Sequence, residues 1–235
     1  MAYVYAPDRK AERRITHLAG FRGVLQVDGY GGYKPLAEHG DVHLAFCWSH
    51  VRRRFFELAS AGPAPIASEA LARIAVLYRI EAEIRGRSAE ERRAVRQARS
   101  RPVVEGLAPW LGEQLSRISQ KSRLAEAIRY ALSRWAGLSL FLEDGRIEID
   151  SNTVERAIRP LALTRKNALF AGSDGGAEHW AVIAPLVATC KLIGVEPHAY
   201  LADVITRIVN GHPNSRIDEL LPWAYPPVPT LKAVA

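Results

Sequence analysis

Short apolar runs separated by polar, glycine-containing turns dominate the first sixty residues. Residues 23–27 form an apolar run rich in β-branched side chains with glycine on both sides, which predicts a buried strand. Residues 42–48 predict a second strand, and residues 3–6 predict a strand at the start of the chain. A helix is expected over residues 50–58, with Ser49 as its cap. This part of the chain therefore predicts a small sheet with helices around it.

From about residue 66 to residue 142 the apolar positions recur with helical spacing, and no strand-like run interrupts them. Ser88 and Glu91 have the spacing of a capping box, and Pro102 is expected to end or kink the helix that they open. The other helices expected here span residues 67–85, 103–118 and, after a cap at Ser122, 123–142. This is an all-helical insertion. The arginines before Pro102 are interpreted as a solvated face, with a DNA contact as the alternative.

The last third of the chain also predicts helices. Asn152 is a good cap for a helix that Pro160 should stop or kink, and a glycine-rich loop covers residues 167–176. A helix over residues 177–193 is expected to end at Gly194, and Pro197 opens another over residues 198–209. A short helix is expected within residues 212–223, and residues 226–235 look like a disordered tail.

Composition and charge narrow the function classes. Lys plus Arg outnumber Asp plus Glu by 32 to 25, and the resulting formal charge of +7 favours a polyanionic partner such as DNA. The two cysteines, Cys47 and Cys190, form neither a CxxC metal pair nor a disulfide framework, so a reducing cytoplasm is expected. No apolar stretch is long enough for a membrane span, and the first residues do not form a secretory signal.

Three groups of polar residues are candidates for chemistry, and each has a structural alternative. Asp28 directly follows the predicted strand of residues 23–27, where α/β folds place reactive groups, but it could equally cap the turn. The arginines at 52–54 stand near the head of a helix, where the helix dipole favours acids; this suggests binding, with a solvated face as the alternative. Glu155 could complete a capping box with Asn152 or pair with Arg159.

Four motifs in this order resemble the bacterial insertion-sequence sixty-six family of transposases. They occupy residues 27–33 (VDGYGGY), 47–53 (CWSHVRR), 150–156 (DSNTVER) and 165–167 followed by Gly172 and Ser173. The likeness covers about residues 3–225. It implies an α/β fold with a ribonuclease-H-like core and a DDE triad of acids, in which Asp28 is similar to the second acid and Glu155 to the third.

The resemblance also implies cofactors, partners and further site residues. Mg²⁺ or Mn²⁺ would be held by Asp28 and Glu155, because hard carboxylate oxygens suit these ions. Two such ions can activate a nucleophile and stabilise the leaving oxygen in phosphodiester cleavage. The implied partner is DNA, at insertion-sequence ends and at target sites, in a synaptic homo-oligomer of the bacterial, nucleoid-associated cytoplasm. The candidate DNA-contacting residues are His50, Arg52, Arg53, Arg165 and Lys166.

The chain departs from the family pattern at the first acid, which the family places in an Asp-(Asp/Glu)-Thr-Pro-like motif upstream of the strand predicted here at residues 3–6. We therefore expect an N-terminally truncated transposase whose core is incomplete, with its first strands missing and its catalysis impaired. The alternative is a non-catalytic remnant that binds DNA or a full-length transposase. The expected parts are core residues 1–60, a helical insertion 61–145, further core 146–211, and a C-terminal segment 212–235.

Overall fold

The computed structural model describes residues 3–8, 10–38, 41–168 and 172–225, and at residues 153, 161 and 164–168 it describes the backbone alone. The chain divides into two units, residues 9–156 and residues 1–8 together with 157–235. Among the described residues no helix is both long enough and apolar enough to cross a membrane.

The sheet lies in the unit of residues 9–156, and its described part has two parallel strands. Strands β1 (Gly23–Val27) and β2 (Val42–Phe46) pair in register from Gly23 opposite Val42 to Val27 opposite Phe46. Helix α2 (Lys34–Ala37) lies in the connection between them and packs against β2. Both strands were predicted, but β1 is only half-buried: Val27 is its one buried residue.

Helices make up the rest of the described secondary structure, together with short 3₁₀ and π turns. The α-helices not yet given are α1 (Ala11–His17), α3 (Trp48–Ser60), α4 (Pro65–Glu83), α5 (Ala89–Val95), α6 (Arg101–Ser116), α7 (Arg123–Leu132), α8 (Trp135–Ser139), α9 (Asn152–Ala168), α10 (Asp174–Ile193) and α11 (Pro197–Val209). This mostly helical structure is compatible with the α/β class, while the ribonuclease-H-like core stays a prediction.

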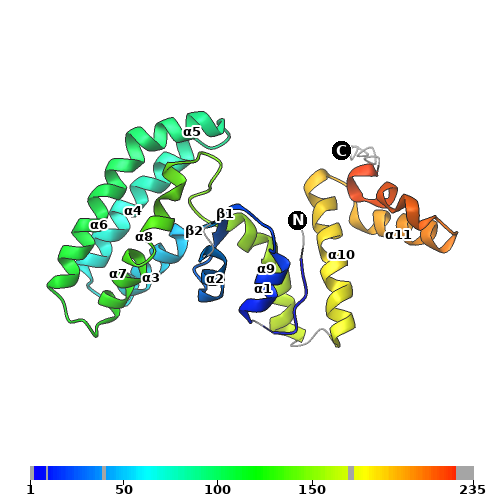
Figure 1. The fold of residues 1–235 in the computed structure, drawn as a ribbon, viewed down its shortest axis with the longest axis horizontal. Coiled ribbons are helices and arrows are strands. Elements are labelled where there is room, and N and C mark those ends of the chain that lie inside the picture. The colour runs from blue at the N-terminus through cyan, green and yellow to red at the C-terminus, as the bar shows by residue number, and fades with distance from the viewer. Residues whose placement is uncertain (1–2, 9, 39–40, 169–171, 226–235) are drawn as a thin grey trace, which may run out of the picture. The chain divides into compact units, whose positions relative to one another are not determined.

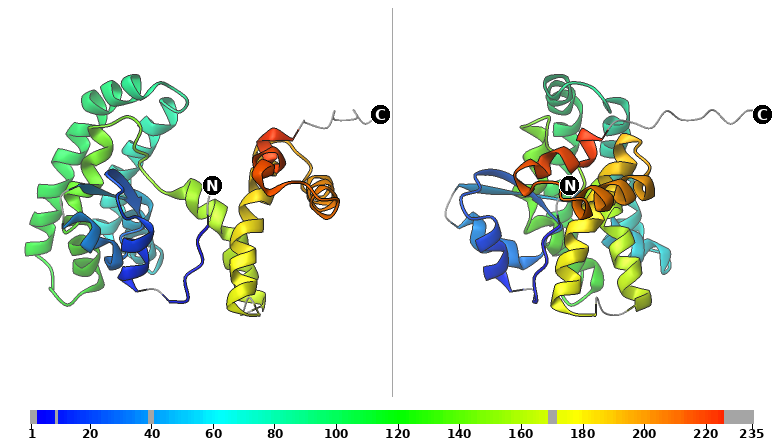
Figure 2. Two further views of the ribbon diagram at one scale, coloured as in Figure 1. Left: turned by 45° about the vertical axis from the view of Figure 1, so that its right-hand side comes forward. Right: turned by 90° about the vertical axis from the view of Figure 1, so that its right-hand side faces the viewer.

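The core of residues 9–156 lies where α3, α4, α6 and α7 pack on one another beside the sheet (Figures 1 and 2). Trp48 is fully buried at the start of α3, and its indole N–H donates to the carbonyl of Leu138 at 2.9 Å. The ring of Trp135 meets it edge-on, with centroids 5.6 Å apart. These contacts connect the helical insertion to the end of β2, so the insertion helps to shape the edge of the sheet.

Several local predictions are confirmed by capping contacts. Ser88 and Glu91 form both bonds of the capping box at the start of α5, and the side chain of Ser122 caps α7. Gly194 ends α10 with a φ of 75°, in the left-handed region that glycine adopts without strain. The helix before Pro102 changes to a π-helical turn, Arg96–Ser100, before α6 begins.

Other predictions were wrong at element ends. Residues 3–6 are not a strand: the hydroxyl of Tyr3 instead donates to the carbonyl of Ala157. Residues 123–142 do not form one helix, because α7 ends at Leu132 and a separate α8 follows. Of the two outcomes expected at Pro160, a stop or a kink, the stop is wrong, because α9 continues to Ala168. Helix α3 begins at Trp48 with Cys47 as its cap residue, two residues before the expected start.

In the other unit, α10 and α11 pack on each other around a smaller core. Tyr200 is buried at its centre, donates its hydroxyl to the carbonyl of Leu220 at 2.7 Å, and meets the ring of Tyr225 edge-on. The segment expected to be a short helix within residues 212–223 forms 3₁₀ turns at Asn214–Leu220 and Pro222–Ala224. The expected disordered tail and residues 169–171 of the glycine-rich loop lie outside the described residues.

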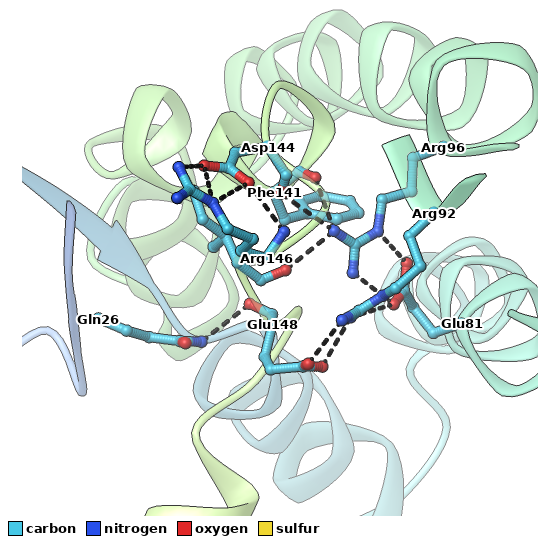
Figure 3. A network of polar contacts seen from close by, with 9 residues as sticks. Gln26, Glu81, Arg92, Arg96, Phe141, Asp144, Arg146 and Glu148 are labelled. Atoms are coloured by element: carbon cyan, nitrogen blue, oxygen red, sulfur yellow. Dashed lines mark hydrogen bonds and ion pairs between the residues drawn. The ribbon is translucent and has the colours of Figure 1, made fainter. Parts of the chain in front are cut away.

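The interpretation of the insertion's arginines as a solvated face was wrong for Arg96, which is fully buried (Figure 3). Its guanidinium binds both carboxylate oxygens of Glu81 at 2.7 Å. One of its nitrogens, Nη1, also donates to the carbonyls of Phe141, Asp144 and Ile147, at 3.0, 3.3 and 2.9 Å. Arg96 therefore holds the loop that leads out of the helical insertion.

Arg92 extends this network toward the sheet. It binds both carboxylate oxygens of Glu148, at 2.8 and 2.9 Å, and lies 3.6 Å from Glu81 (Figure 3). The carbonyl of Glu148 in turn accepts from the side-chain amide of Gln26 on β1 at 2.8 Å. The network thus connects the insertion, the segment that precedes α9, and the first strand.

Candidate functional site

The candidate site is built at the carboxyl edge of the sheet. Because β1 and β2 are parallel and end together at Val27 and Phe46, the residues that follow them, Asp28 and Cys47, leave the sheet at the same edge. Adjacent strands lie about 4.8 Å apart. Parallel strands bring residues from different parts of the chain to one edge in this way, and loops beyond that edge are accessible to ligands.

Asp28 is exposed and lies in a turn that its own side chain closes. Its Oδ1 accepts the backbone N–H of Tyr30 at 3.0 Å, so the turn-capping role considered from the sequence is present. Gly29 has a φ of 87°, and a Cβ there would lie 2.7 Å from the hydroxyl of Tyr130 on α7. Arg134 donates to the carbonyl of Gly29 at 3.3 Å. The helical insertion therefore holds the turn that presents Asp28.

A cavity of about 260 Å³ borders Asp28. Arg14, Tyr30 and Tyr33 line it with the aspartate, and the guanidinium of Arg14 lies 4.7 and 5.2 Å from the centres of the two tyrosine rings. A carboxylate and a guanidinium thus share one opening at the end of β1.

Glu155 is brought to the same edge by the segment that precedes α9. The carbonyl of Ile149 accepts the backbone N–H of Trp48 at 3.0 Å, and the N–H of Ser151 donates to the sulfur of Cys47 at 3.2 Å. These bonds attach the segment to the start of α3, immediately after β2. Glu155 follows in the first turn of α9, and its Oε1 accepts the hydroxyl of Ser151 at 2.8 Å.

The capping box expected between Asn152 and Glu155 was wrong, because Asn152 is the first helical residue and lies inside the helix. Its backbone and side-chain N–H groups instead donate to the carboxylate of Asp150, at 3.1 and 2.6 Å. Besides Ser151, the structure brings Glu155 together with His50 on α3, with Nε2 3.2 Å from Oε1. No pattern in the sequence predicts that these two side chains meet.

His50 and Glu155 line a second cavity of about 260 Å³. Arg52 and Arg53 line it with them, and both arginines are exposed. The third arginine of the run, Arg54, turns away to lie 4.0 Å from the ring centre of Tyr130 and 3.5 Å from Glu126. Because α3 starts earlier than predicted, these arginines lie in its second turn.

The predicted site residues are thus only partly brought together. His50, Arg52, Arg53 and Glu155 share one cavity, whereas Asp28 lies at the same sheet edge beside the other. Arg165 and Lys166 lie in α9, but their side chains fall outside the described part of the chain. Their proposed DNA contacts stay a prediction.

Cys47 belongs to this site although sequence reasoning gave it no role. It is buried at the junction of β2 and α3, and its sulfur lies close to Glu155 and His50. The spacing Cys47-Trp48-Ser49-His50 at a predicted strand-to-helix junction was the available signal. It places a thiol and an imidazole one helical turn apart.

Comparison with known families agrees with the resemblance that the sequence motifs indicate. The model described as Transposase IS66 family matches residues 1–179, and that of the IS66 C-terminal element matches residues 186–223. This chain belongs to the IS66 transposase family. The family resemblance predicted from the sequence is therefore confirmed.

Curated relatives of this IS66-family chain include three uncharacterized proteins of Sinorhizobium fredii. One, y4qI, is 46% identical over 97% of this chain and 43% of its own length, and another, y4jD, is 46% identical over 95% and 45%. The third, y4hP, is 43% identical over 95% of this chain and 43% of its own length. The chain thus spans less than half the length of these relatives. No solved structure gives a significant match.

Proposed function

We propose that this chain forms part of the catalytic domain of a DDE-type transposase, which cleaves and transfers DNA strands during insertion-sequence transposition. The observation that carries the proposal is the position of Asp28 and Glu155. In a chain of this family, the two acids that match the family motifs both stand at the carboxyl edge of the sheet, although the whole helical insertion separates them in sequence.

Each of the two acids offers carboxylate oxygens, the ligands that a hard divalent cation prefers. Asp28 has one carboxylate oxygen bound within its turn, and the carboxylate of Glu155 lies 3.2 Å from a buried His50 nitrogen that makes no hydrogen bond within the described structure. Carboxylate oxygens of this kind suit Mg²⁺ and Mn²⁺, so Asp28 and Glu155 would hold the ion. When bound, such an ion polarises a phosphate oxygen and activates the attacking hydroxyl.

The chain's own residues then bind and orient the DNA. Arg52 and Arg53 are exposed in the cavity of Glu155, and an arginine fork can contact two phosphate oxygens at once. Phosphates bound there would bring the scissile strand to the sheet edge, and the net charge of +7 would favour the encounter. We extend the proposal to a synaptic homo-oligomer in the bacterial cytoplasm, acting on element ends and target DNA.

Because the resemblance implies three acids and this chain offers matches to two, we propose that catalysis by the chain alone is impaired. A second candidate function follows from the same site. Asp28 and Glu155 line separate cavities, while Arg52 and Arg53 stand ready for phosphates. This favours a chain that binds DNA, or a full-length transposase, without cutting.

The experiment uses the purified chain, a DNA fragment that carries the terminal inverted repeats, and Mg²⁺ or Mn²⁺. Strand nicking and the mobility shift of the DNA are measured side by side for Asp28→Asn and Glu155→Gln. Asp41→Asn and Glu126→Gln are matched controls, because Asp41 precedes β2 at the opposite edge of the sheet and Glu126 is an exposed acid of α7.

Nicking that is lost in the two site variants and retained in the two controls supports the transposase proposal. A mobility shift without nicking, reduced by Arg52→Ala with Arg53→Ala but unchanged in the acid variants, supports the binding function instead. Nicking that survives both Asp28→Asn and Glu155→Gln would overturn the assigned acids.

A further inference from the structure

Three side chains of different chemistry converge where β2 passes into α3. The sulfur of Cys47, a ring nitrogen of His50 and a carboxylate oxygen of Glu155 all lie within 4.8 Å of one another. In a tetrahedral zinc site, the usual metal–ligand bonds place the donor atoms roughly 3.3–3.6 Å apart. Small side-chain movements would therefore bring all three atoms to one ion.

The contact between His50 and Glu155 also suits two ligands of a shared ion. Nε2 lies 3.2 Å from Oε1, yet this buried nitrogen makes no hydrogen bond within the described structure. A buried nitrogen that lacks a hydrogen-bond partner is costly. The two atoms are close enough for both to be ligands of one cation, which would satisfy both.

The sulfur of Cys47 has the surroundings of a metal-bound thiolate. The backbone N–H of Ser151 donates to it at 3.2 Å, and the hydroxyl of Ser49 lies 2.9 Å from it. Cys47 is also the cap residue of α3, where the helix dipole favours negative charge. Outer contacts of this kind hold metal ligands in place.

We propose that Cys47, His50 and Glu155 bind a thiophilic divalent cation of the Zn²⁺ class. A thiolate and an imidazole select Zn²⁺ or Co²⁺ over Mg²⁺, which prefers oxygen ligands alone. The thiolate and the carboxylate neutralise the ion, offsetting the repulsion from Arg52 and Arg53, and the thiol proton is released to solvent on binding. The cavity beside His50 and Glu155 gives access to the ion and to a fourth ligand, a water or a phosphate oxygen.

The effect of a bound Zn²⁺ ion on DNA nicking rests on the proposed function. The ion uses the carboxylate of Glu155, which the Mg²⁺-dependent reaction also needs, so Zn²⁺ competes with Mg²⁺ and lowers nicking. Asp28 belongs to the oxygen-only site and takes no part in binding the thiophilic ion. The two metal sites thus share one ligand and differ in the others.

The test uses Co²⁺ as the probe, added to the purified full chain in the presence of a thiol-free reductant. Bonding of a thiolate to Co²⁺ gives a charge-transfer band in the near ultraviolet. Added Zn²⁺, which gives no such band, should displace Co²⁺ from the site and abolish the band. This readout does not depend on nuclease activity. Cys190→Ser is the matched control, because Cys190 is the other buried cysteine of the chain.

The proposal expects a band in the unaltered chain, in Cys190→Ser and in Asp28→Asn, and its loss in Cys47→Ser. His50→Gln and Glu155→Gln should each weaken Co²⁺ binding at least tenfold. Absence of the band from the unaltered chain, its survival in Cys47→Ser, or its loss in Cys190→Ser would overturn the site. If Cys47→Ser does not fold, as judged by circular dichroism, His50→Gln decides: unchanged Co²⁺ affinity overturns the proposal. A positive Co²⁺ result without any nicking would leave the metal site standing and count against the transposase proposal alone.

Discussion

Among single substitutions in the polar network, removal of the Arg96 side chain is expected to lower the stability of the fold most. Arg96→Ala leaves Glu81, which is only 9% exposed, with Arg92 at 3.6 Å as its remaining charged contact in the described structure. It also removes the donor from three backbone carbonyls, of Phe141, Asp144 and Ile147, at the end of the insertion. Breaking a buried pair in this way costs about 3–5 kcal/mol of unfolding free energy.

The chain contains a matched control for this substitution. Arg99 and Glu83 form a similar two-atom contact between the same two elements, but their side chains are 49% and 53% exposed. Exposed pairs contribute little, so Arg99→Ala is expected to change stability only slightly. The double variant Arg96→Met with Glu81→Met should be more stable than either single variant, because no unpaired charge stays buried.

Urea denaturation followed by tryptophan fluorescence measures these differences, since Trp48 and Trp135 lie against each other in the core of the same unit. Near-ultraviolet circular dichroism checks that the folded variants keep this packing. A loss of unfolding free energy in Arg96→Ala no larger than that in Arg99→Ala would refute the reasoning. A double variant whose loss equals the sum of the losses in the two single variants would refute it as well.

Three further substitutions test the surroundings of the site. Gly137→Ala should lower the unfolding free energy by about 1–3 kcal/mol, because its methyl group would collide with β2. Gly112→Ala, in open space on α6, should instead raise the unfolding free energy by about 0.5–1 kcal/mol. Equal effects of the two substitutions in urea denaturation would contradict this prediction. Gly29→Ala should cost about 1–2 kcal/mol for its φ of 87°, and nicking should fall with it because the Asp28 turn shifts. Hydrogen bonds from Arg146 lower the pKa of Asp144 from 3.8 to about 2, so this carboxylate contributes stability above pH 3.8 that is lost as the pH falls through about 2. Thermal midpoints of Asp144→Asn should therefore lie below those of the unaltered chain at neutral pH and converge with them near pH 2; a constant gap would contradict the assignment.

Local sequence signals predicted the parts of the fold that local chemistry determines. The run 23–27 became β1 with the predicted ends, and the caps at Ser88 and Ser122 formed as expected. Each of these depends on side chains and backbone groups a few residues apart. Residues 3–6, in contrast, have strand-forming side chains but are not a strand, because a strand also requires a partner that no local pattern specifies.

In the candidate site, too, local features could be predicted from the sequence and contacts between distant segments could not. The position of Asp28 after a strand could be predicted from the sequence, and the family motif marked Glu155. The contact of Glu155 with His50, and the burial of Arg96 against Glu81, depend on how the insertion folds back on the sheet. Two acids, Glu81 and Glu83, and two arginines, Arg96 and Arg99, lie on the two segments, and the sequence alone does not show which pair is buried.

The most direct test of the central claim is whether Asp28 and Glu155 bind the same ion. Electron paramagnetic resonance measures the fraction of Mn²⁺ bound by the unaltered chain, by Asp28→Asn, by Glu155→Gln and by the double variant, with Asp41→Asn as the control. A shared ion predicts that each single substitution removes the same bound Mn²⁺, that the double variant loses no more, and that the control binds normally. Independent losses that add in the double variant, or full binding in either single variant, would contradict the account.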